Sequence, residues 1–292
     1  MIDTIKSHLS YDQKVFLKKW INRTDKFVSR TVFRYGSPEL KNALQQLGVE
    51  RGDTLLVHSK IKFNSGFSGN PQDVIDCVLD VIGEEGNLLM MSLPYGSSTL
   101  EYLQKNEVFD VKKTPSRMGI ITEIFRRKKG VVRSLHPGHP VLAYGKDAGR
   151  IVKDHEKCLY SCGKGSPFDA FTSLDGKILF FDTTFRPITY IHYIEDLIKD
   201  RLPFPLYTAE PISSLARGYD GKEIVIKTFP FDRFVFENRN SLILGEYMEK
   251  DNRLKRKKLG RTELILIKAE EAIRCTYKML GENRYFYRGL DG

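Results

Sequence analysis

The chain has 292 residues, of which 41% are hydrophobic and 29% are charged. These proportions are typical of a globular protein with a sizeable core, and they exclude a largely disordered chain. No apolar run approaches the roughly 18 residues that a membrane-spanning helix needs, so we expect no stable membrane insertion and a cytoplasmic location. The formal net charge of +10 predicts attraction to anionic partners and repulsion of strongly cationic ones.

The cysteines predict neither a disulfide framework nor a metal site. Cys158 and Cys162 are four residues apart, whereas Cys77 and Cys275 are isolated. One such pair without a second pair nearby is a poor zinc signature, so we expect reduced thiols and no bound metal. An alternative remains open, in which Cys158 or Cys162 is the nucleophile of a ping-pong acyl transfer and works with a histidine.

Residues 1–37 are predicted to form a basic, amphipathic helical extension that ends near Gly36-Ser37-Pro38. This extension is either a helix packed on the edge of the domain or an element for dimerisation or for closing a site.

From residue 38 onward, helical and strand patterns alternate. This alternation predicts one mixed α/β catalytic domain over residues 38–292, with a central mixed β-sheet flanked by helices. A loop is expected over 94–117, and the segment after residue 203 is rich in strands before a last helix. The expected helices cover 38–47, 71–82, 118–128, 147–154, 189–200 and about 264–280, and the expected strands cover 54–58, 86–93, 131–133, 141–144, 177–181, 223–228 and 233–236.

A first group of candidate site residues lies between two expected strands, in the segment Arg133-Ser134-Leu135-His136-Pro137-Gly138-His139-Pro140. We expect an exposed turn, because its prolines fix the backbone around a guanidinium, a hydroxyl and two imidazoles. Such a set suits the handling of a phosphate or a thioester better than core packing.

A second group is Thr189-x-x-His192-x-x-Glu195, which directly follows an expected strand. In a helix, residues three apart are neighbours, so His192 can contact both Thr189 and Glu195. A glutamate that accepts a hydrogen bond from one imidazole nitrogen leaves the other nitrogen as a proton acceptor. The first turn of a helix also lowers the pKa of a histidine, which favours a neutral base. Most such His/Glu pairs are ordinary surface contacts, and the spacing alone does not separate the two interpretations.

Two further segments have polar residues at the ends of elements. Gly163-Lys164-Gly165-Ser166-Pro167 is a glycine turn that either forms a wall of a site or is a simple connection. Val57-His58-Ser59 ends a buried strand, and backbone amides at such a point often hold anionic groups.

The chain also carries nine short motifs in a fixed order. They are Gly48-Val49 with Gly52-Asp53, Val57-His58-Ser59, Thr114-Pro115-Ser116-Arg117-Met118-Gly119, Glu123-Ile124-Phe125-Arg126, Arg133-Ser134-Leu135-His136-Pro137, Ala143-Tyr144-Gly145, Gly165-Ser166-Pro167, Asp175-Gly176-Lys177-Ile178-Leu179 and Thr189-x-x-His192-x-x-Glu195. In this order they resemble the aminoglycoside 3-N-acetyltransferase family, also called the antibiotic N-acetyltransferases. Each motif is weak by itself, but the nine in register are specific.

The resemblance implies the fold of that family and direct transfer of an acetyl or short acyl group from acyl-CoA to the amine of a sugar. By similarity, His192 is the general base and Glu195 is the acid that orients it. The resemblance also implies a set of residues that hold acyl-CoA, with Thr189 beside the thioester: Val57, His58, Ser59, Arg133, Ser134, His136 and Thr189.

The chain departs from the family where the acceptor would bind. Asp182 stands where relatives have a glycine, and the loop with Arg186 is aromatic and basic. We therefore expect Ser166, Asp182 and Arg186 to contact the acceptor. The basic segment 250–261 is either a solvated loop, a site for the 3′-phosphate of CoA, or part of a site for an anionic acceptor.

The positive net charge of the chain favours an anionic acceptor over a cationic one. An aminoglycoside is polycationic and requires an acidic pocket, whereas a nucleotide-linked amino sugar carries a diphosphate and suits a basic protein. We therefore expect the nucleotide-linked amino sugar of surface polysaccharide synthesis, with an aminoglycoside as the alternative. A nucleic-acid-binding protein is a more distant alternative, because no recognisable binding motif accompanies the charge. The sequence is compatible with a homo-oligomer but does not fix the oligomeric state.

Overall fold

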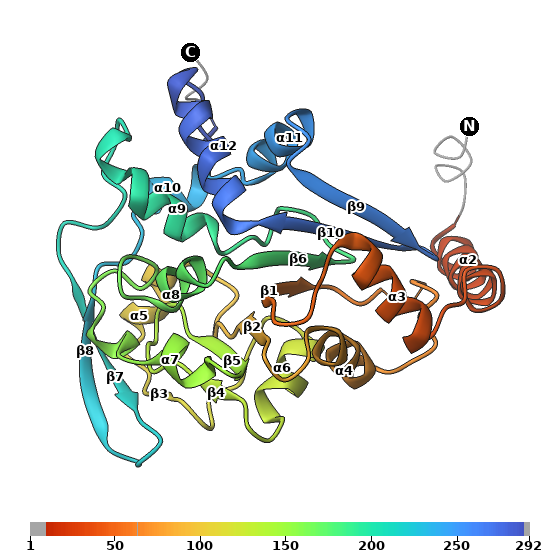
Figure 1. The fold of residues 1–292 in the computed structure, drawn as a ribbon, viewed down its shortest axis with the longest axis horizontal. Helices are drawn as coiled ribbons and strands as arrows, with labels where there is room; N and C mark the ends of the chain where they lie inside the picture. Colours follow the sequence, from red (N-terminus) through yellow and green to blue (C-terminus); the bar gives the residue numbers. More distant parts are fainter. Residues whose placement is uncertain (1–9, 63, 289–292) are drawn as a thin grey trace.

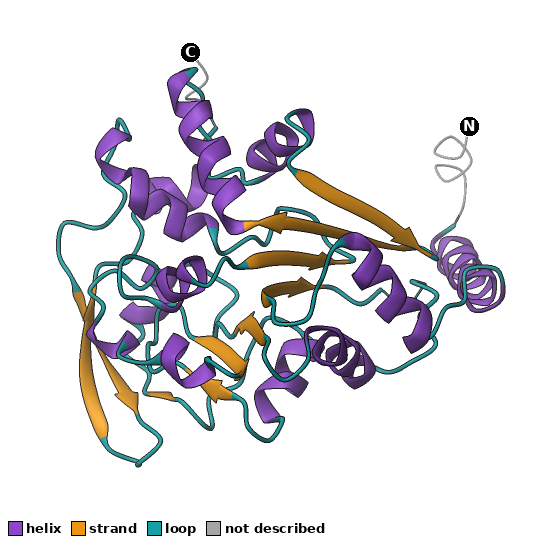
Figure 2. Ribbon diagram, viewed as in Figure 1, coloured by secondary structure: helices purple, strands orange, loops and turns teal. Residues whose placement is uncertain are grey.

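The computed structural model describes residues 10–62 and 64–288 and confirms the mixed α/β class (Figures 1 and 2). A seven-stranded sheet in the order β4-β5-β2-β1-β6-β10-β9 runs through the domain. Its strands are β1 (Thr54–Ser59), β2 (Asn87–Met91), β4 (Val132–Arg133), β5 (Val141–Gly145), β6 (Lys177–Phe181), β9 (Leu254–Leu259) and β10 (Thr262–Lys268).

The centre of this sheet is parallel and its sides are antiparallel. β1 pairs in parallel with both β2 and β6, with Leu55 opposite Leu88 and Lys177 in the two registers. β5 and β10 pair antiparallel with the outer strands of this trio. A strand that is covered on both faces must be apolar throughout, which explains the continuous run Leu55-Leu56-Val57.

Helices cover both faces of the sheet, and alternate strand residues enter two separate cores. Leu55 and Leu179 pack with the helices of one face, whereas Leu56 and Ile178 pack with those of the other. The first face is covered by α3 (Ser37–Leu47), α4 (Pro71–Ile82) and α6 (Ile120–Arg127), and the second by α7 (Ala148–Val152), α8 (Pro167–Ser173), α9 (Ile191–Ile198), α11 (Leu242–Lys250) and α12 (Ala269–Gly281).

A second, three-stranded sheet lies beside the main one in the order β3-β7-β8 (Figure 1). It consists of β3 (Phe109–Asp110), β7 (Ile212–Arg217) and β8 (Glu223–Thr228). Only β8 was expected. The expected loop over 94–117 contains β3 and also α5 (Thr99–Gln104).

Two other expectations are wrong at the level of elements, and so is one alternative, a solvated loop over the basic segment. Residues 233–236 belong to the helix α10 (Arg233–Asn238), and the first part of the expected last helix is the strand β10. The basic segment 250–261 is largely the edge strand β9, paired along its length with β10. Lysine and arginine on an edge strand hinder pairing with a second chain, which is a sufficient structural reason for their presence.

The N-terminal extension contains α2 (Tyr11–Thr31), which starts at the Ser10/Gln13 capping box. Residues 1–9 of the expected extension lie outside the described residues. Figure 1 shows α2 at the margin of the domain, separated from the helices that cover the sheet. No helix in the described part of the chain is both long and apolar enough to cross a membrane.

Candidate active site

The candidate site lies at the carboxyl edge of the three parallel strands. β1 ends in His58 and Ser59, β6 leads into Asp182, and β2 leads towards Leu93. The loop before β5 reaches the same edge, because β5 runs antiparallel to β2 and the Ser92 backbone amide donates to the Pro140 carbonyl oxygen. This edge is where open α/β sheets commonly bind ligands.

His192 and Glu195 form a hydrogen-bonded pair on α9. His192 Nδ1 lies 3.1 Å from Glu195 Oε2, as their spacing on one helix predicts. Glu195 is fully buried, so its carboxylate cannot reach water. Thr189 lies outside α9, which contradicts the expected helical series, and only its backbone carbonyl oxygen bonds to the His192 amide.

Arg239 and Tyr287 complete the surroundings of Glu195. The Arg239 guanidinium donates two hydrogen bonds to the carboxylate, from Nε to Oε1 at 2.6 Å and from Nη2 to Oε2 at 2.8 Å. The Tyr287 hydroxyl donates to Oε1. Such a bidentate pair with an arginine supplies the countercharge that a buried carboxylate requires.

This arrangement sets the charge states of the pair. Burial opposes ionisation of Glu195, but the Arg239 and His192 contacts outweigh it and bring the pKa of Glu195 to about 2. Burial and the Arg239 charge lower the pKa of His192 to about 4, although the Glu195 hydrogen bond opposes this shift. His192 is therefore neutral at pH 7. Since the ionised Glu195 only accepts, the His192 proton lies on Nδ1 and Nε2 is free to take a proton.

A cavity of about 110 Å³ opens beside His192. Aromatic and hydroxyl-bearing side chains dominate its wall, and the His139 ring lies edge-on to the His192 ring with their centroids 5.1 Å apart. None of the residues that line it is an aspartate or a glutamate. They are Leu93, Tyr95, Ser97, Ser98, Thr99, His139, His192, Phe231, Phe236 and Arg239.

The histidine loop is buried, so the expectation of an exposed turn is wrong. The Arg133 guanidinium donates to the carbonyl oxygens of Ser92 and Thr114, which binds it to the fold. The Ser134 side chain is buried, and its hydroxyl oxygen lies 2.8 Å from His155 Nδ1. His136 stacks on His155 at 4.6 Å between ring centroids. The expected contacts of Arg133, Ser134 and His136 with acyl-CoA remain predictions.

Other expected ligand contacts carry buried polar atoms that have no hydrogen-bond partner among the described residues. These atoms are His58 Nε2, Ser166 Oγ, Asp182 Oδ2 and Thr189 Oγ1. A buried polar atom without a partner is costly, so their presence fits a polar ligand that supplies the missing hydrogen bonds. The expected contacts of His58 and Thr189 with acyl-CoA, and those of Ser166 and Asp182 with the acceptor, remain predictions.

The remaining expected contacts are placed differently. The Val57 side chain packs in the core beneath α3 and α4, so only its backbone is available to a ligand. Ser59 is partly exposed at the end of β1. Arg186 is exposed, and it does not line the cavity beside His192.

Asp182 stands out because its backbone has a φ of 55°, in the left-handed region that glycine adopts readily. A glycine would adopt this backbone conformation at lower cost than an aspartate. Here the carboxylate Oδ1 accepts from Lys62 Nζ at 2.8 Å. This ion pair places a lysine at the carboxyl edge of the sheet.

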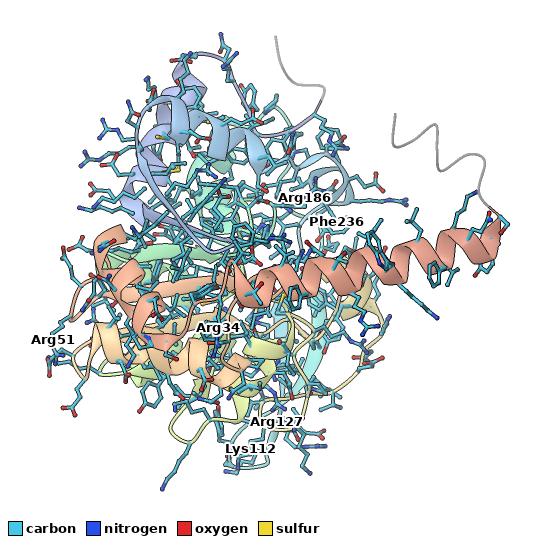
Figure 3. All side chains as sticks on the ribbon, turned by 90° about the vertical axis from the view of Figure 1, so that its right-hand side faces the viewer. Arg34, Arg51, Lys112, Arg127, Arg186 and Phe236 are labelled. Carbon is cyan, nitrogen blue, oxygen red and sulfur yellow. The ribbon has the colours of Figure 1, made fainter. Side chains whose placement is uncertain are left out.

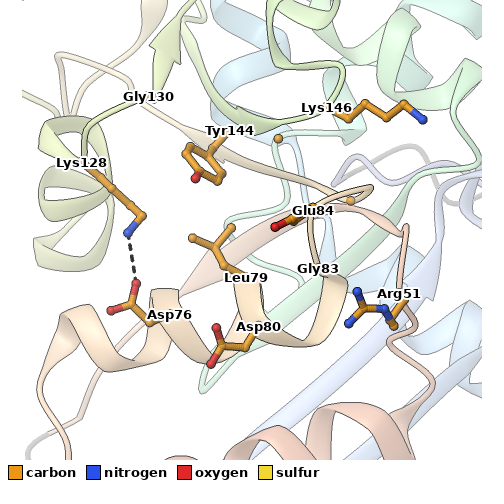
Figure 4. Close-up of a pocket in the computed structure, with 12 residues that line it drawn as sticks. Arg51, Asp76, Leu79, Asp80, Gly83, Glu84, Lys128, Gly130, Tyr144 and Lys146 are labelled. Atoms are coloured by element: carbon orange, nitrogen blue, oxygen red, sulfur yellow. Dashed lines mark hydrogen bonds and ion pairs between the residues drawn. The ribbon is translucent and has the colours of Figure 1, made fainter.

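A larger cavity, of about 800 Å³, lies away from His192 (Figure 4). It is at the amino end of β2, where Gly86 precedes the strand, and Lys128 pairs with Asp76 across it at 3.2 Å. It contains no histidine, so we do not assign the chemistry to it. Within the described residues, no cluster of three or more histidine, cysteine, aspartate or glutamate side chains could hold a metal ion.

The thiols do not have the properties of nucleophiles. Burial raises the pKa of Cys158 to about 11, and burial also raises the pKa of Cys162 well above its usual range. A nucleophilic cysteine instead needs a lowered pKa. The structure therefore gives no support to ping-pong transfer through Cys158 or Cys162.

Sequence reasoning missed Arg239 and Tyr287. They lie 44 and 92 residues from Glu195, and no spacing pattern connects them to it. The one usable signal is general, because a buried carboxylate in a catalytic pair requires a cation whose position only the fold can show.

Comparisons with known proteins identify the family of the chain. The family model for aminoglycoside 3-N-acetyltransferase matches residues 56–281. The aminoglycoside N(3')-acetyltransferase-like protein YokD of Bacillus subtilis is 25% identical over 268 residues, which are 85% of this chain and 93% of that protein. Aminoglycoside N(3)-acetyltransferase III of a Salmonella species is 25% identical over 224 residues, which are 70% of this chain and 76% of that protein.

Solved structures show the same fold. Aminoglycoside acetyltransferase AAC(3)-Xa has a TM-score of 0.75 at 22% identity, over 89% of this chain and 98% of that chain. AAC-IIIb with CoASH has a TM-score of 0.71 at 20% identity, over 85% of this chain and 97% of that chain. Since the family model matches well over half of the 292 residues, the chain belongs to the aminoglycoside 3-N-acetyltransferase family and is an acyl-CoA-dependent N-acyltransferase.

Proposed function

We propose that this protein transfers the acetyl group of acetyl-CoA directly to a primary amine of an aminoglycoside, with His192 as the general base. The observation that carries the proposal is the buried Glu195 carboxylate, which Arg239 keeps ionised while it accepts from His192 Nδ1. His192 is thereby oriented and neutral, as a base at neutral pH must be. The names of the relatives support an aminoglycoside as the acceptor.

The residues of the chain would act together on the acceptor amine. His192 lines the cavity, and its Nε2 takes the proton that the amine loses as it bonds to the acetyl carbon of the thioester. The C–S bond of the thioester then breaks, and the imidazolium returns the proton to the departing CoA thiolate. Glu195 holds the imidazole in one tautomer and stabilises the imidazolium that forms. The unpartnered polar atoms of His58 and Thr189 would hold the arm of acetyl-CoA, and that of Ser166 would contact the acceptor. Much of the rate comes from this positioning of both substrates.

A second candidate acceptor is a nucleotide-linked amino sugar of surface polysaccharide synthesis, which the sequence alone favoured. The relatives give it no support. One observation favours it: no carboxylate side chain lines the cavity beside His192, where a polycation would need one.

The test is acetyl transfer by the purified protein with acetyl-CoA and two panels of acceptors, gentamicin-type aminoglycosides and nucleotide-linked amino sugars. We expect release of CoA and an acetylated product by mass spectrometry with an aminoglycoside. The matched control is His192→Ala, which should bind acetyl-CoA in a thermal-shift assay without transferring it. Turnover of the nucleotide-linked sugars alone would replace the first candidate by the second, and turnover of neither panel would reject both.

A further inference from the structure

The helix α2 has a stripe of large apolar side chains that no other described part of the chain covers. Phe16, Trp20 and Phe27 are 73%, 57% and 69% exposed. In a helix these positions lie on one face, because they are separated by four and seven residues. Aromatic groups gathered in this way on a soluble protein mark a surface that contacts something else.

The stripe faces away from the domain. Asp25 forms an ion pair with Arg261 and accepts from Asn64, and the Ser29 side chain is buried, so this side of the helix packs on the domain. With about 100° per residue, Trp20 lies about 180° around the helix from Ser29, and the two phenylalanines lie within about 40° of Trp20. The stripe therefore cannot act as a lid on the protein's own site while these contacts hold.

Figure 3 shows the course of α2 from the side of the molecule on which it lies. The helix crosses that side of the molecule, and its N-terminal part extends beyond the domain. Its C-terminal part is fixed by the Asp25 contacts and by Arg261, whose guanidinium lies 4.8 Å from the centroid of the Phe33 ring. The aromatic stripe is thus presented outward on a tethered helix.

The charge of α2 indicates what can cover the stripe. The helix sequence has six lysines and arginines against two aspartates, and one of these aspartates, Asp25, is already neutralised by Arg261. Lys19 and Arg23 are exposed and adjoin the stripe. Pairing two such helices in a symmetric dimer would bring like charges together, whereas an anionic surface would neutralise them.

An aromatic stripe flanked by basic residues matches the interface of an anionic lipid bilayer. Tryptophan prefers the level of the lipid head groups, and lysine and arginine near the surface each add about 1 kcal/mol of attraction to anionic lipid. Helices with this distribution lie in the plane of the interface and do not span it.

We propose that α2 docks this protein on the surface of membranes that contain anionic phospholipid. Phe16, Trp20 and Phe27 enter the boundary between head groups and acyl chains, and Lys19 and Arg23 contact the lipid phosphates. Binding is peripheral and independent of acetyl transfer.

The single tryptophan of the chain makes the test direct, because Trp20 lies within the stripe. The full-length protein is mixed with vesicles of phosphatidylglycerol and phosphatidylcholine, and with vesicles of phosphatidylcholine alone. We expect a blue shift of Trp20 emission, quenching by brominated lipid and co-sedimentation with the anionic vesicles only. Raising the salt to 1 M should weaken binding, since it shortens the screening length to about 3 Å.

Variants that keep Trp20 as the reporter locate the contact. Phe16→Ser/Phe27→Ser should weaken binding at least tenfold, because the burial of each phenylalanine is lost. Lys19→Gln/Arg23→Gln should weaken it about tenfold or more and reduce its salt dependence. The matched control is Ile120→Ser/Val225→Ser, which removes two similarly exposed apolar side chains elsewhere and should leave binding unchanged.

Two results would overturn the proposal. One is Trp20 emission that is the same with and without anionic vesicles. The other is emission that is already blue-shifted without lipid and depends on protein concentration, together with a dimer mass in light scattering, because a second copy would then cover the stripe. Acetyl transfer in solution should be unchanged in Phe16→Ser/Phe27→Ser, so a failure here is distinguishable from a failure of the proposed function.

Discussion

At the scale of single residues, the Glu195 carboxylate receives hydrogen bonds from three side chains, His192, Arg239 and Tyr287. Its pKa of about 2 means that it stays ionised throughout the range in which the enzyme can work. It therefore orients His192 and stabilises the imidazolium, but it does not receive the proton itself.

Replacing His192 tests the role of the base. His192→Ala should fold normally and lose about two to four orders of magnitude in the rate of transfer, because general base catalysis is worth about that much. The measurement is single-turnover transfer at saturating acetyl-CoA, with melting temperature as the control for folding. Near-normal turnover in this variant would remove His192 from the mechanism.

Replacing Arg239 tests what keeps Glu195 ionised and His192 neutral. Arg239→Ala leaves a buried carboxylate without its cation, which should reduce the free energy of unfolding by about 3 kcal/mol or more. It also removes the positive charge that lowers the pKa of His192, so the acid limb of the profile of kcat/KM against pH should move to higher pH. The matched control is Arg233→Ala on α10, the helix that directly precedes Arg239, because Arg233 pairs with Glu237 at the surface. Identical pH profiles for the two variants would contradict this role.

At the scale of elements, the sequence predicts most of the central fold because its signals are local and strong. Residues 71–82 have a proline in the first turn, an asparagine cap and apolar residues at helical spacing, and α4 has these bounds. Residues 233–236 look like a strand from their phenylalanines and valine, but the Asp232 side chain accepts from the Phe234 amide and starts a helix. In such a short segment, one capping residue can decide between helix and strand.

The candidate site was predictable to the same extent. His192 and Glu195 are on one helix, so their contact follows from spacing. Arg239 and Tyr287 reach Glu195 from other elements, and their contacts depend on long-range packing that no local pattern encodes. The burial of the loop with Ser134 and His136 was missed for the same reason, since the partner His155 comes from a different segment.

The C-terminal segment has a role that follows from its place in the fold. The amide of Asn240 donates to the Phe286 carbonyl oxygen, and Arg239 forms a β-bridge with Tyr287, so this segment holds the cation and the hydroxyl beside Glu195. Tyr287→Phe should reduce the free energy of unfolding by about 1–3 kcal/mol, because Glu195 loses a buried donor. Urea unfolding measures this, with the partly exposed Tyr285→Phe as the control. Equal stability of the two variants would show that the Tyr287 hydroxyl is not needed.

At the scale of the whole molecule, four of the six histidines are buried, His192 is half-buried, and the sixth, His8, lies outside the described residues. Burial lowers the pKa of His58 to about 3 and those of His136 and His192 to about 4. Burial also lowers the pKa values of His139 and His155 well below the usual range. The native state therefore keeps all five imidazoles neutral at a pH where the unfolded chain already binds protons.

This difference predicts a steep loss of stability in mild acid. Above pH 6.5 both states are neutral and the histidines contribute no pH dependence. Below it the unfolded state takes up more protons than the native state, so the free energy of unfolding falls as the pH is lowered towards about 4. Each histidine contributes up to about 1.4 kcal/mol per pH unit, so five contribute up to about 7 kcal/mol per pH unit. A decrease of that size over one pH unit is comparable with the whole stability of a typical domain.

Urea unfolding at a series of pH values from 8 to 5 measures this dependence. We expect a nearly constant midpoint above pH 7 and a steep decrease below pH 6.5. His58→Phe is an informative variant, because His58 Nε2 has no partner among the described residues and its ring stacks on Phe180, which a phenylalanine can also do. It should flatten the dependence by about 1.4 kcal/mol per pH unit. A midpoint that stays constant from pH 7 to pH 5 would mean that the buried histidines are protonated without cost, and the neutral charge state of His192 on which the proposed base depends would then fail with them.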